Sequence, residues 1–340
     1  MENNTDINLE SRMKGALYGL YIGDALAMPV HWYYDREALK RDYGRVTDYM
    51  TPKNPHPGSI LSYKGYKPLN EKGEILHDQA QYWGKKGIHY HQFLKAGENT
   101  LNLKIVNLLI DSLNEKGIYD ADDYLERYIS FMTTPGMHKD TYVEEYHRHF
   151  FTEYAKGVSP RKCGHEEKHI GGLAGLTPIV LFYCKDPERA KEAALEHLSL
   201  SHLGKLMEEA ANVFIDILLA VLGGSQLRAE ILKSTGSMLL PFDADTFLKW
   251  LDQPDEEIVG GRFSAACYVN EAIPSVAYLA YKYSENPEEC LIANTNLGGD
   301  NAYRGAVLGA LTGAFNGFDA WPERWVKGLL NPPYKLNKVV

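Results

Sequence analysis

The sequence predicts an all-α fold, and three observations point to this class. In most long segments apolar residues recur at intervals of three and four, the period of one face of an α-helix. Alternation of apolar and polar residues, which is typical of half-buried strands, is hard to find. Two segments carry glycine at every fourth residue, which suits helices that pack closely. No linker typical of a domain boundary interrupts the chain, so we expect a single compact helical domain over residues 1–340.

In chain order, the periodic segments predict helices over residues 9–27, 99–115, 121–132, 140–156, 187–200, 204–222, 243–251, 264–284 and 302–316. Between the first two of these, the stretch 45–75 has too many prolines for a helix. We expect it to form a long ordered loop, and such loops often line functional sites. A second break at 157–173 combines proline, glycine and charge before another apolar helix begins.

The first and last long helices share a stripe of glycines, which are Gly15, Gly19 and Gly23 in one and Gly305, Gly309 and Gly313 in the other. Glycine inside a helix costs about 0.5–1 kcal/mol relative to alanine, so a repeated stripe implies a close approach of two backbones. An aspartate adjoins each stripe, Asp24 after the first and Asp300 before the second. We expect the two helices to bring both carboxylates to one cleft. The alternative is that both aspartates are helix caps or turn formers.

Charge and cysteine content exclude several classes of function. The net charge of −9 argues against a nucleic-acid partner and against a hold on an anionic membrane surface. The cysteines are scattered without a Cys-x-x-Cys pair, the N-terminal residues are not signal-like, and no apolar run reaches the roughly 20 residues of a membrane span. We expect a reduced, cytoplasmic, soluble protein that acts on a small molecule or a protein substrate.

A third polar segment, Gly97-Glu98-Asn99-Thr100, lies where a helix is predicted to begin. Glu98 and Asn99 could cap this helix or point at a ligand. Carboxylate and amide oxygens at several helix ends are also a suitable donor set for Mg²⁺, which prefers oxygen ligands. Both interpretations are open at this point.

Together these segments resemble the ADP-ribosylglycohydrolase family. The stretch "GDALAMP" at 23–29 is similar to the family's first motif, and residues 97–100 fall on its Thr-Asp-Asp-Thr motif. Residues 298–303 fall on its Gly-Gly-Asp-Thr-Asp-Thr motif, which a glycine- and alanine-rich helix follows, and Ser201-His202 is a weaker match. The resemblance covers about residues 12–318. It implies the family's helical fold and the hydrolysis of an N- or O-glycosidic bond to ribose, in an ADP-ribosyl or nucleoside-like substrate.

The metal motifs depart from the family pattern. Members bind two Mg²⁺ or Mn²⁺ ions through six positions, which here are Gly97, Glu98, Asn99, Asp300, Ala302 and Tyr303. The four carboxylates have become two, and an alanine cannot bind a metal. We therefore expect at most one Mg²⁺ or Mn²⁺ ion, or none. Its ligands would be Glu98, Asn99, Asp300 and Asn301, with waters completing the shell.

The resemblance also suggests roles for individual residues. The family's pocket glutamate falls on His31, so the predicted catalytic residues are His31, Glu98 and Asp300. One ion would orient the ribose hydroxyls and a water, and His31 would protonate the leaving group. The predicted substrate-binding residues are Asp24, His89, His91, Gln92, His169, Gly299 and Tyr303. The charged stretch 138–151, with Asp140, Glu144, Glu145 and Arg148, is interpreted as a solvated helix face.

A rival hypothesis is a relative that has kept the fold and lost catalysis, as some lens crystallins similar to this family have. Such a protein would bind a ligand or serve a structural role. Metal titration distinguishes the two hypotheses at the lowest cost, since the hydrolase would retain an ion-dependent step.

Overall fold

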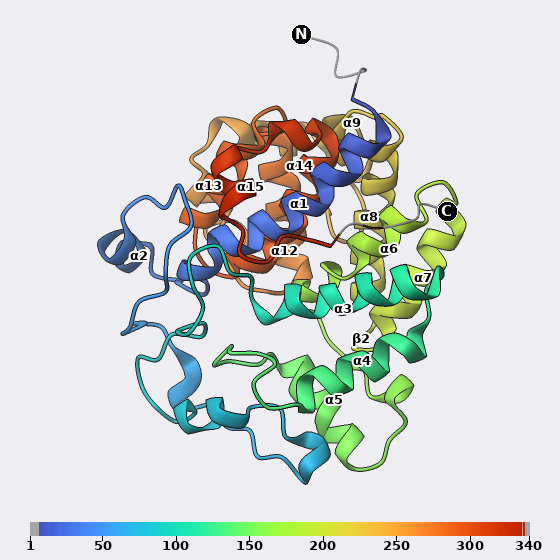
Figure 1. The fold of residues 1–340 in the computed structure, drawn as a ribbon. Coiled ribbons are helices and arrows are strands. Elements are labelled where there is room, and N and C mark those ends of the chain that lie inside the picture. Colours follow the sequence, from blue (N-terminus) through green and yellow to red (C-terminus); the bar gives the residue numbers. More distant parts are fainter. Residues whose placement is uncertain (1–6, 335, 337–340) are drawn as a thin grey trace.

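The centre of the fold is a pair of antiparallel helices, α1 (Leu9–Ala27) and α14 (Asn301–Asn316), which lie side by side in Figure 1. The computed structural model describes residues 7–334 and 336. A Cβ atom added to Gly19 would lie 2.0 Å from the carbonyl oxygen of Gly309, and one added to Gly23 would lie 2.0 Å from that of Gly305. The predicted packing of the two glycine stripes is therefore confirmed, and it requires glycine on both helices.

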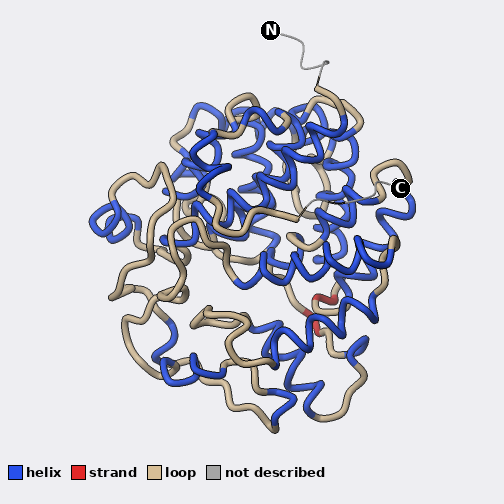
Figure 2. The backbone as a smooth tube through the Cα atoms, viewed as in Figure 1, coloured by secondary structure: helices blue, strands red, loops and turns tan. Residues whose placement is uncertain are grey.

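The remaining elements surround this pair. The other α-helices are, in chain order, α2 (Arg36–Tyr43), α3 (Leu101–Lys116), α4 (Ala121–Thr133), α5 (Glu145–Ala155), α6 (Leu176–Phe182), α7 (Pro187–Ser199), α8 (Lys205–Leu222), α9 (Leu227–Lys233), α10 (Ala244–Leu248), α11 (Asp255–Ile258), α12 (Val269–Lys282), α13 (Pro287–Asn296) and α15 (Glu323–Gly328). The strands β1 (His165–Glu166) and β2 (His202–Leu203) form a short parallel pair, drawn red in Figure 2. The predicted all-α class is confirmed, with a single compact helical domain.

Local chemistry explains where many helices begin and end. The Asp120 side chain accepts hydrogen bonds from the backbone of Asp122 and Asp123 at the start of α4. Asp186 does the same for Arg189 in α7, whose first residue is a proline. Helix α3 ends at Lys116 and is capped by Gly117, which has a left-handed φ of 70°. These are the usual signals of helix starts and stops, because they satisfy end groups that the helix cannot pair itself.

Most of the long predicted helices are confirmed to within two residues at each end, but two predicted starts are wrong. The helix expected over 140–156 begins at Glu145, and the one expected over 264–284 spans Val269–Lys282. Residues just before these helices are not helical, and some of them pair with distant backbone. The Thr141 N–H donates to the Tyr90 carbonyl at 2.9 Å, and the Ile170 N–H donates to the Cys267 carbonyl at 2.8 Å. The helix expected over 243–251 is α10 followed by a 3-10 turn, η8 (Lys249–Asp252).

Helix α6 follows the break at 157–173, where an apolar helix was expected. Five helices were not predicted from the sequence, namely α2, α9, α11, α13 and α15. Most are short, so few turns are available to show a period. Helix α13 is longer, but it is buried at Cys290, Leu291, Asn294 and Thr295. Burial on more than one face erases the apolar stripe by which an amphipathic helix is recognised.

The predicted loop over 45–75 is irregular, with the short 3-10 turns η3 (Ile60–Ser62) and η4 (Glu71–Gly73). Irregular structure continues past the predicted end, through η5 (His77–Tyr82), to the start of α3. In Figure 2 this tan segment runs along the part of the molecule opposite α14. His56, His89 and Tyr90 are buried within it. The loop therefore contributes to the interior of the protein.

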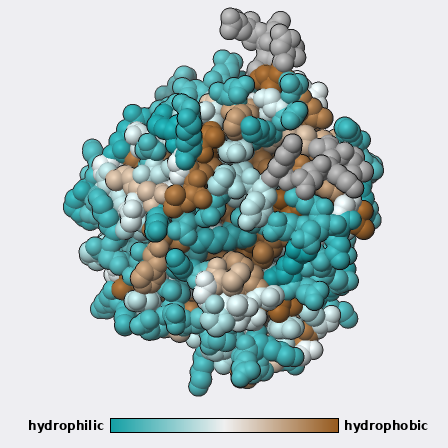
Figure 3. All heavy atoms as spheres, in the orientation of Figure 1, coloured by the Kyte–Doolittle hydropathy of each residue, from teal (hydrophilic) through white to brown (hydrophobic). Residues whose placement is uncertain are grey.

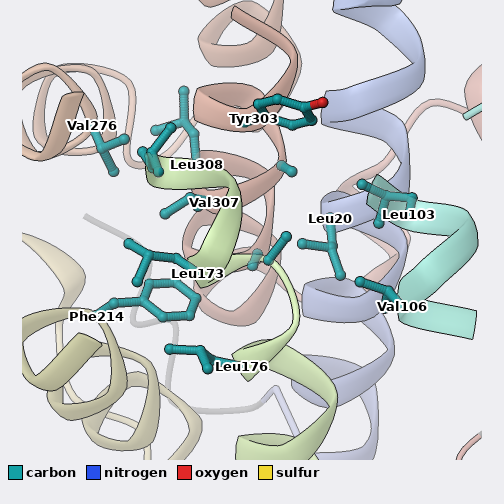
Figure 4. Close-up of a cluster of buried hydrophobic side chains, with 14 of the residues drawn as sticks. Leu20, Leu103, Val106, Leu173, Leu176, Phe214, Val276, Tyr303, Val307 and Leu308 are labelled. Atoms are coloured by element: carbon teal, nitrogen blue, oxygen red, sulfur yellow. The ribbon is translucent and has the colours of Figure 1, made fainter. Parts of the chain in front are cut away.

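The hydrophobic core lies against the two central helices. Figure 4 shows Leu20 of α1 near Leu103 and Val106 of α3, and Leu173 near Phe214 of α8. Burying an aliphatic or aromatic side chain of this size contributes about 1.5–3 kcal/mol. Hydrophilic side chains cover most of the face shown in Figure 3, with smaller hydrophobic areas between them. Among the described residues, no helix has both the length and the apolar character needed to cross a bilayer.

Candidate functional site

The glycine pair before α14 holds Asp300 against the segment that follows α1. Gly298 and Gly299 both have left-handed φ values, 68° and 67°. A Cβ atom on Gly299 would lie 2.1 Å from the Ala265 carbonyl oxygen, so only glycine fits there. The Gly299 N–H donates to the Tyr33 carbonyl at 2.7 Å, and the Trp32 N–H donates to the Gly299 carbonyl at 2.8 Å. These two hydrogen bonds fix the segment after α1, which contains His31, relative to Asp300.

As a result, His31 and Asp300 contact each other in the interior. The Nε2 atom of His31 lies 3.0 Å from Oδ1 of Asp300, and both side chains are fully buried. Asp300 occupies the N-cap position of α14, but its side chain forms no capping hydrogen bond there. The alternative that it is a helix cap therefore holds for its place in the chain and not for its side chain. Burial raises the pKa of Asp300 and lowers that of His31. Both shifts favour a neutral pair over an ion pair.

His31 begins a chain of contacts that leads to Asp140. The Nδ1 atom of His31 lies 2.8 Å from Nε2 of His91, whose own Nδ1 lies 2.8 Å from Oδ1 of Asp140. Burial alone would raise the pKa of Asp140, but Lys104 and the hydrogen bond from His91 outweigh it and lower that pKa. An ionised Asp140 must accept the proton of His91 Nδ1. With both imidazoles neutral, His91 Nε2 then accepts from His31, and His31 Nε2 accepts the carboxyl proton of Asp300.

A second carboxyl group, Glu144, lies on the other side of Asp300. It directly precedes α5, and its Oε1 accepts a hydrogen bond of 3.0 Å from the Tyr303 hydroxyl. The Nε2 atom of His169 lies 3.6 Å from Oε2 of Glu144 and 3.5 Å from Oδ2 of Asp300. His169 Nε2 and Asp300 Oδ2 are buried without a hydrogen-bond partner. Buried polar atoms rarely stay unpaired, so these two atoms suit a water molecule or a substrate hydroxyl as their partner.

Electrostatics prepare these two carboxyl groups for proton transfer. Burial raises the pKa of Glu144 well above its usual range, and the neighbouring Asp300 raises it further. Burial and the neighbouring carboxyl group both disfavour ionisation, so each of these two groups tends to keep its proton. The arrangement therefore offers a protonated acid at neutral pH, next to a carboxyl group connected through His31 to further proton acceptors.

Cys267 completes a group of potential metal ligands. Each of three residues offers one ligand atom, and these atoms all lie within 4.8 Å of one another. The residues are His169, Cys267 and Asp300. The Gly171 N–H, however, donates to His169 Nδ1 at 3.0 Å, which leaves the proton of a neutral imidazole on Nε2. Burial, and then Asp300 and Glu144, raise the pKa of the Cys267 thiol. A protonated nitrogen and a neutral thiol are not prepared for metal binding, since metals bind the deprotonated forms.

The residues at the family's metal positions do not fit divalent ions. Gly97 has a φ of 79°, and a Cβ there would lie 2.0 Å from the Gly328 carbonyl oxygen, so no side chain could act as a ligand. Glu98 Oε1 lies 3.1 Å from Lys104 Nζ. The Tyr303 hydroxyl is used by Glu144. The unpaired oxygens that remain are Oδ1 of Asn99 and Asn301 and Oδ2 of Asp300. Two neutral amides and a carboxyl group whose pKa is raised compensate an ion's charge poorly.

Other predicted site residues have structural partners. Asp24 accepts hydrogen bonds from Asn99 Nδ2 at 2.9 Å, from the Thr100 N–H at 2.8 Å and from the Thr100 hydroxyl at 2.7 Å. It therefore holds the start of α3 onto α1, in line with the alternative that it is a cap. His89 uses both ring nitrogens, one to the Pro29 carbonyl and one to the His91 N–H. Neither nitrogen is free for a ligand.

Two further predicted residues bind neighbouring segments. Gln92 donates to the Thr141 hydroxyl at 3.2 Å and accepts from the side chain of Asn54 at 3.0 Å. Asn301 donates to the carbonyls of Thr295 and Val30, at 2.8 and 3.3 Å. The structure thus brings together His31, His91, His169, Asp300 and Tyr303. Glu98 interacts with Lys104, and Asn99 with Asp24.

Two important carboxylates lie in a different environment from the one that the sequence predicted. Asp140 and Glu144 were interpreted as part of a solvated helix face, but both are buried and precede the helix. The available signal was the lack of a helical period before Tyr146. Lys104 was not singled out, although it lies three residues after Leu101 and four before Leu108, on the apolar side of α3. A charged residue in an apolar stripe often has a buried partner.

The three hydrogen bonds of Asp24 lead to a stability prediction. We expect Asp24→Ala to lower the free energy of unfolding by about 3 kcal/mol, because each lost hydrogen bond contributes about 1 kcal/mol. Urea unfolding followed by circular dichroism measures this. The control is Asp35→Ala, which removes an exposed cap of α2 and should cost about 1 kcal/mol. Equal losses in the two variants would contradict the role given to Asp24.

Comparisons with known proteins agree with this architecture. The family model described as ADP-ribosylglycohydrolase matches residues 5–339. An uncharacterized protein of Archaeoglobus fulgidus is 23% identical over 327 residues, which cover 94% of this chain and 92% of that protein. A solved structure described as an ADP-ribosylglycohydrolase-related protein complex is 23% identical, with a TM-score of 0.61. That match covers 97% of this chain and 94% of the other, and it indicates a shared fold.

Proposed function

Because this chain belongs to the ADP-ribosylglycohydrolase family, we propose that it hydrolyses an N- or O-glycosidic bond to ribose in an ADP-ribosyl or nucleoside-like substrate. The substrate would be a small molecule or an ADP-ribosylated protein. The observation that carries the proposal is the pair of buried carboxyl groups, Glu144 and Asp300, on either side of the unpaired Nε2 of His169. Two carboxyl groups are the usual minimum for cleaving a glycosidic bond.

In this proposal, Glu144 is the acid. Its proton goes to the leaving-group atom as the bond from that atom to the ribose carbon breaks, and a water oxygen bonds to the same carbon. The water gives its proton to Asp300 Oδ2, while the proton on Oδ1 moves to His31 Nε2. His31 in turn passes its Nδ1 proton to His91 Nε2, and the ionised Asp140 stabilises the imidazolium that forms. The donor and acceptor atoms along this path lie 2.8–3.0 Å apart.

No step in this scheme uses a metal. The sequence predicted at most one Mg²⁺ or Mn²⁺ ion, and the donor atoms at the family's metal positions do not favour even that one. Glu98, which the sequence predicted as catalytic, takes no part in the proton path because it is paired with Lys104. His31 keeps a catalytic role, with its partner now identified as Asp300.

A panel of ribosyl compounds tests the proposal. We expect the chelator-treated protein to release ribose or ADP-ribose from at least one of ADP-ribosyl-arginine, ADP-ribosyl-serine and the common nucleosides, with chromatography as the readout. Asp300→Asn should abolish that release, because an amide cannot accept the water proton. Asp319→Asn, outside the site in the 3-10 turn η9 (Phe318–Ala320), is the matched control and should keep full activity. Absence of release from every compound would overturn the proposal.

One observation favours the rival function, a non-catalytic binding or structural protein. The side chains of His31 and Asp300 are 0% exposed, so a substrate must displace protein atoms to reach them. In that case the panel gives no product. A compound from the panel would then raise the melting temperature without being cleaved, since a ligand that binds the folded state stabilises it.

A further inference from the structure

Lys104 occupies the place between two carboxylates where a cation would be expected. Its Nζ lies 3.1 Å from Oε1 of Glu98 and 3.4 Å from Oδ2 of Asp140. The side chains are largely buried, with 15% of Lys104, 13% of Glu98 and none of Asp140 exposed. Lysine is rarely buried unless it is paired, and here one ammonium faces two carboxylates.

This ammonium lies at one of the family's metal motifs. Glu98 falls on the second motif and Asp300 on the last. A chain of contacts connects these two residues through Lys104, Asp140, His91 and His31, with each side chain within 3.4 Å of the next. Side chains of the protein thus join the carboxyl groups that the sequence predicted to share an ion.

The charges of these side chains also indicate that Lys104 takes the place of a cation. Lys104 supplies one positive charge and three N–H donors to the carboxylates. Without it, Glu98 and Asp140 would be two buried carboxylates close to one cation position, which is a donor set that Mg²⁺ or Mn²⁺ could use. The ammonium therefore both compensates the carboxylates and prevents a divalent ion from binding them.

We propose that Lys104 is a built-in replacement for the divalent cation, and that it organises this site without a metal. In this role Lys104 is a positioning residue, since it holds Asp140 as the acceptor at the end of the His91–His31 path. The inference deepens the proposed function and rests on it for the meaning of that path. Metal binding, however, is measured without any substrate. A failure of this inference is therefore distinguishable from a failure of the proposed hydrolase function.

The test measures the binding of Mn²⁺ to chelator-treated protein. Electron paramagnetic resonance reports the concentration of the free ion. We expect the wild-type protein and Glu98→Gln to bind equally little Mn²⁺. Lys104→Met removes the charge but keeps an unbranched side chain, and it should gain one site per chain. The double variant Lys104→Met/Glu98→Gln should lose that site again, because the carboxylate that binds the ion is gone.

Several outcomes would overturn the proposal. Wild-type protein that binds Mn²⁺ and loses it on Glu98→Gln would show that Lys104 does not exclude the ion. A folded Lys104→Met variant that binds no Mn²⁺ would show that the carboxylates do not form a cation site. Where Lys104→Met does not fold, Lys104→Gln is the second variant, and a folded Lys104→Gln protein that gains no Mn²⁺ site overturns the proposal in the same way. Wild-type binding that Cys267→Ala abolishes would place the metal at His169 and Cys267 and also count against it.

Discussion

Replacing Gly309 with leucine is expected to prevent the protein from folding to its native state. A Cβ atom at this position would lie 2.0 Å from the Gly19 carbonyl oxygen and 2.5 Å from the Gly19 carbonyl carbon. Both of these atoms belong to the backbone, so rotation of a side chain cannot relieve the clash. The helices α1 and α14 would have to separate, and the core that they share would open.

The free-energy contributions of the Gly309→Leu substitution show that its net effect is destabilising. Leucine has a higher helix propensity than glycine by about 1 kcal/mol, which would stabilise an isolated helix. Overpacking inside a well-packed core costs about 1–3 kcal/mol even where side chains can adjust. A clash between two backbones exceeds that range, and a typical domain has about 5–15 kcal/mol of total stability. We therefore expect a net loss large enough to abolish the cooperative thermal transition.

Differential scanning calorimetry and circular dichroism measure this outcome. Gly309→Ala is the milder variant, and it should fold with a lowered melting temperature because it introduces the Cβ alone. Gly65→Leu is the matched control, since nothing lies within 4 Å of a Cβ at that exposed position. A Gly309→Leu variant that melts like the control would contradict the packing of the glycine stripes.

Substituting Glu144 with glutamine is expected to reduce kcat by about 10²- to 10⁴-fold, the usual contribution of a general acid. Glutamine has nearly the same shape, and its carbonyl oxygen can still accept the hydrogen bond from Tyr303. It has no proton to give to a leaving group. The fold should be unchanged, so the melting temperature of this variant is expected to stay close to that of the wild type.

The pH dependence provides a second readout. Burial and the nearby Asp300 raise the pKa of Glu144, so the wild type should keep this acid protonated at neutral pH. Activity should fall as the pH rises through the raised pKa, and that limb should be absent from any residual activity of Glu144→Gln. Glu145→Gln is the control, because the Glu145 side chain is 65% exposed. A control that loses as much activity as Glu144→Gln would contradict the assignment.

The pairing of the central helices was predictable from the sequence. A glycine in a helix has no favourable local explanation, so its repetition at every fourth residue of two helices indicates contact between backbones. The motif around Asp300 was predictable for a similar reason, since two consecutive left-handed residues accept only glycine. The apolar periods of α7 and α8 gave their bounds because each helix is buried along one main face.

The partners of the charged residues were decided by the tertiary structure. Glu144 contacts Tyr303 from 159 residues away, and His31 contacts Asp300 from 269 residues away. A periodic pattern reports which face of a helix is buried, but it does not report which distant side chain meets that face. For this reason Glu144 was interpreted as solvated, and Lys104 was not singled out.

By itself, the sequence determined the helical class, the contact of the glycine stripes and the membership of a family. These depend on local periodicity and on backbone positions that accept only glycine. The tertiary structure decided the chemistry of the site. It paired Glu98 with an ammonium, used Asp24 to hold α3, and placed Glu144 beside Asp300. The physical reason is that the protonation state and metal affinity of a buried carboxyl group depend on the charges and donors within a few ångströms, and the packing of distant segments sets those neighbours.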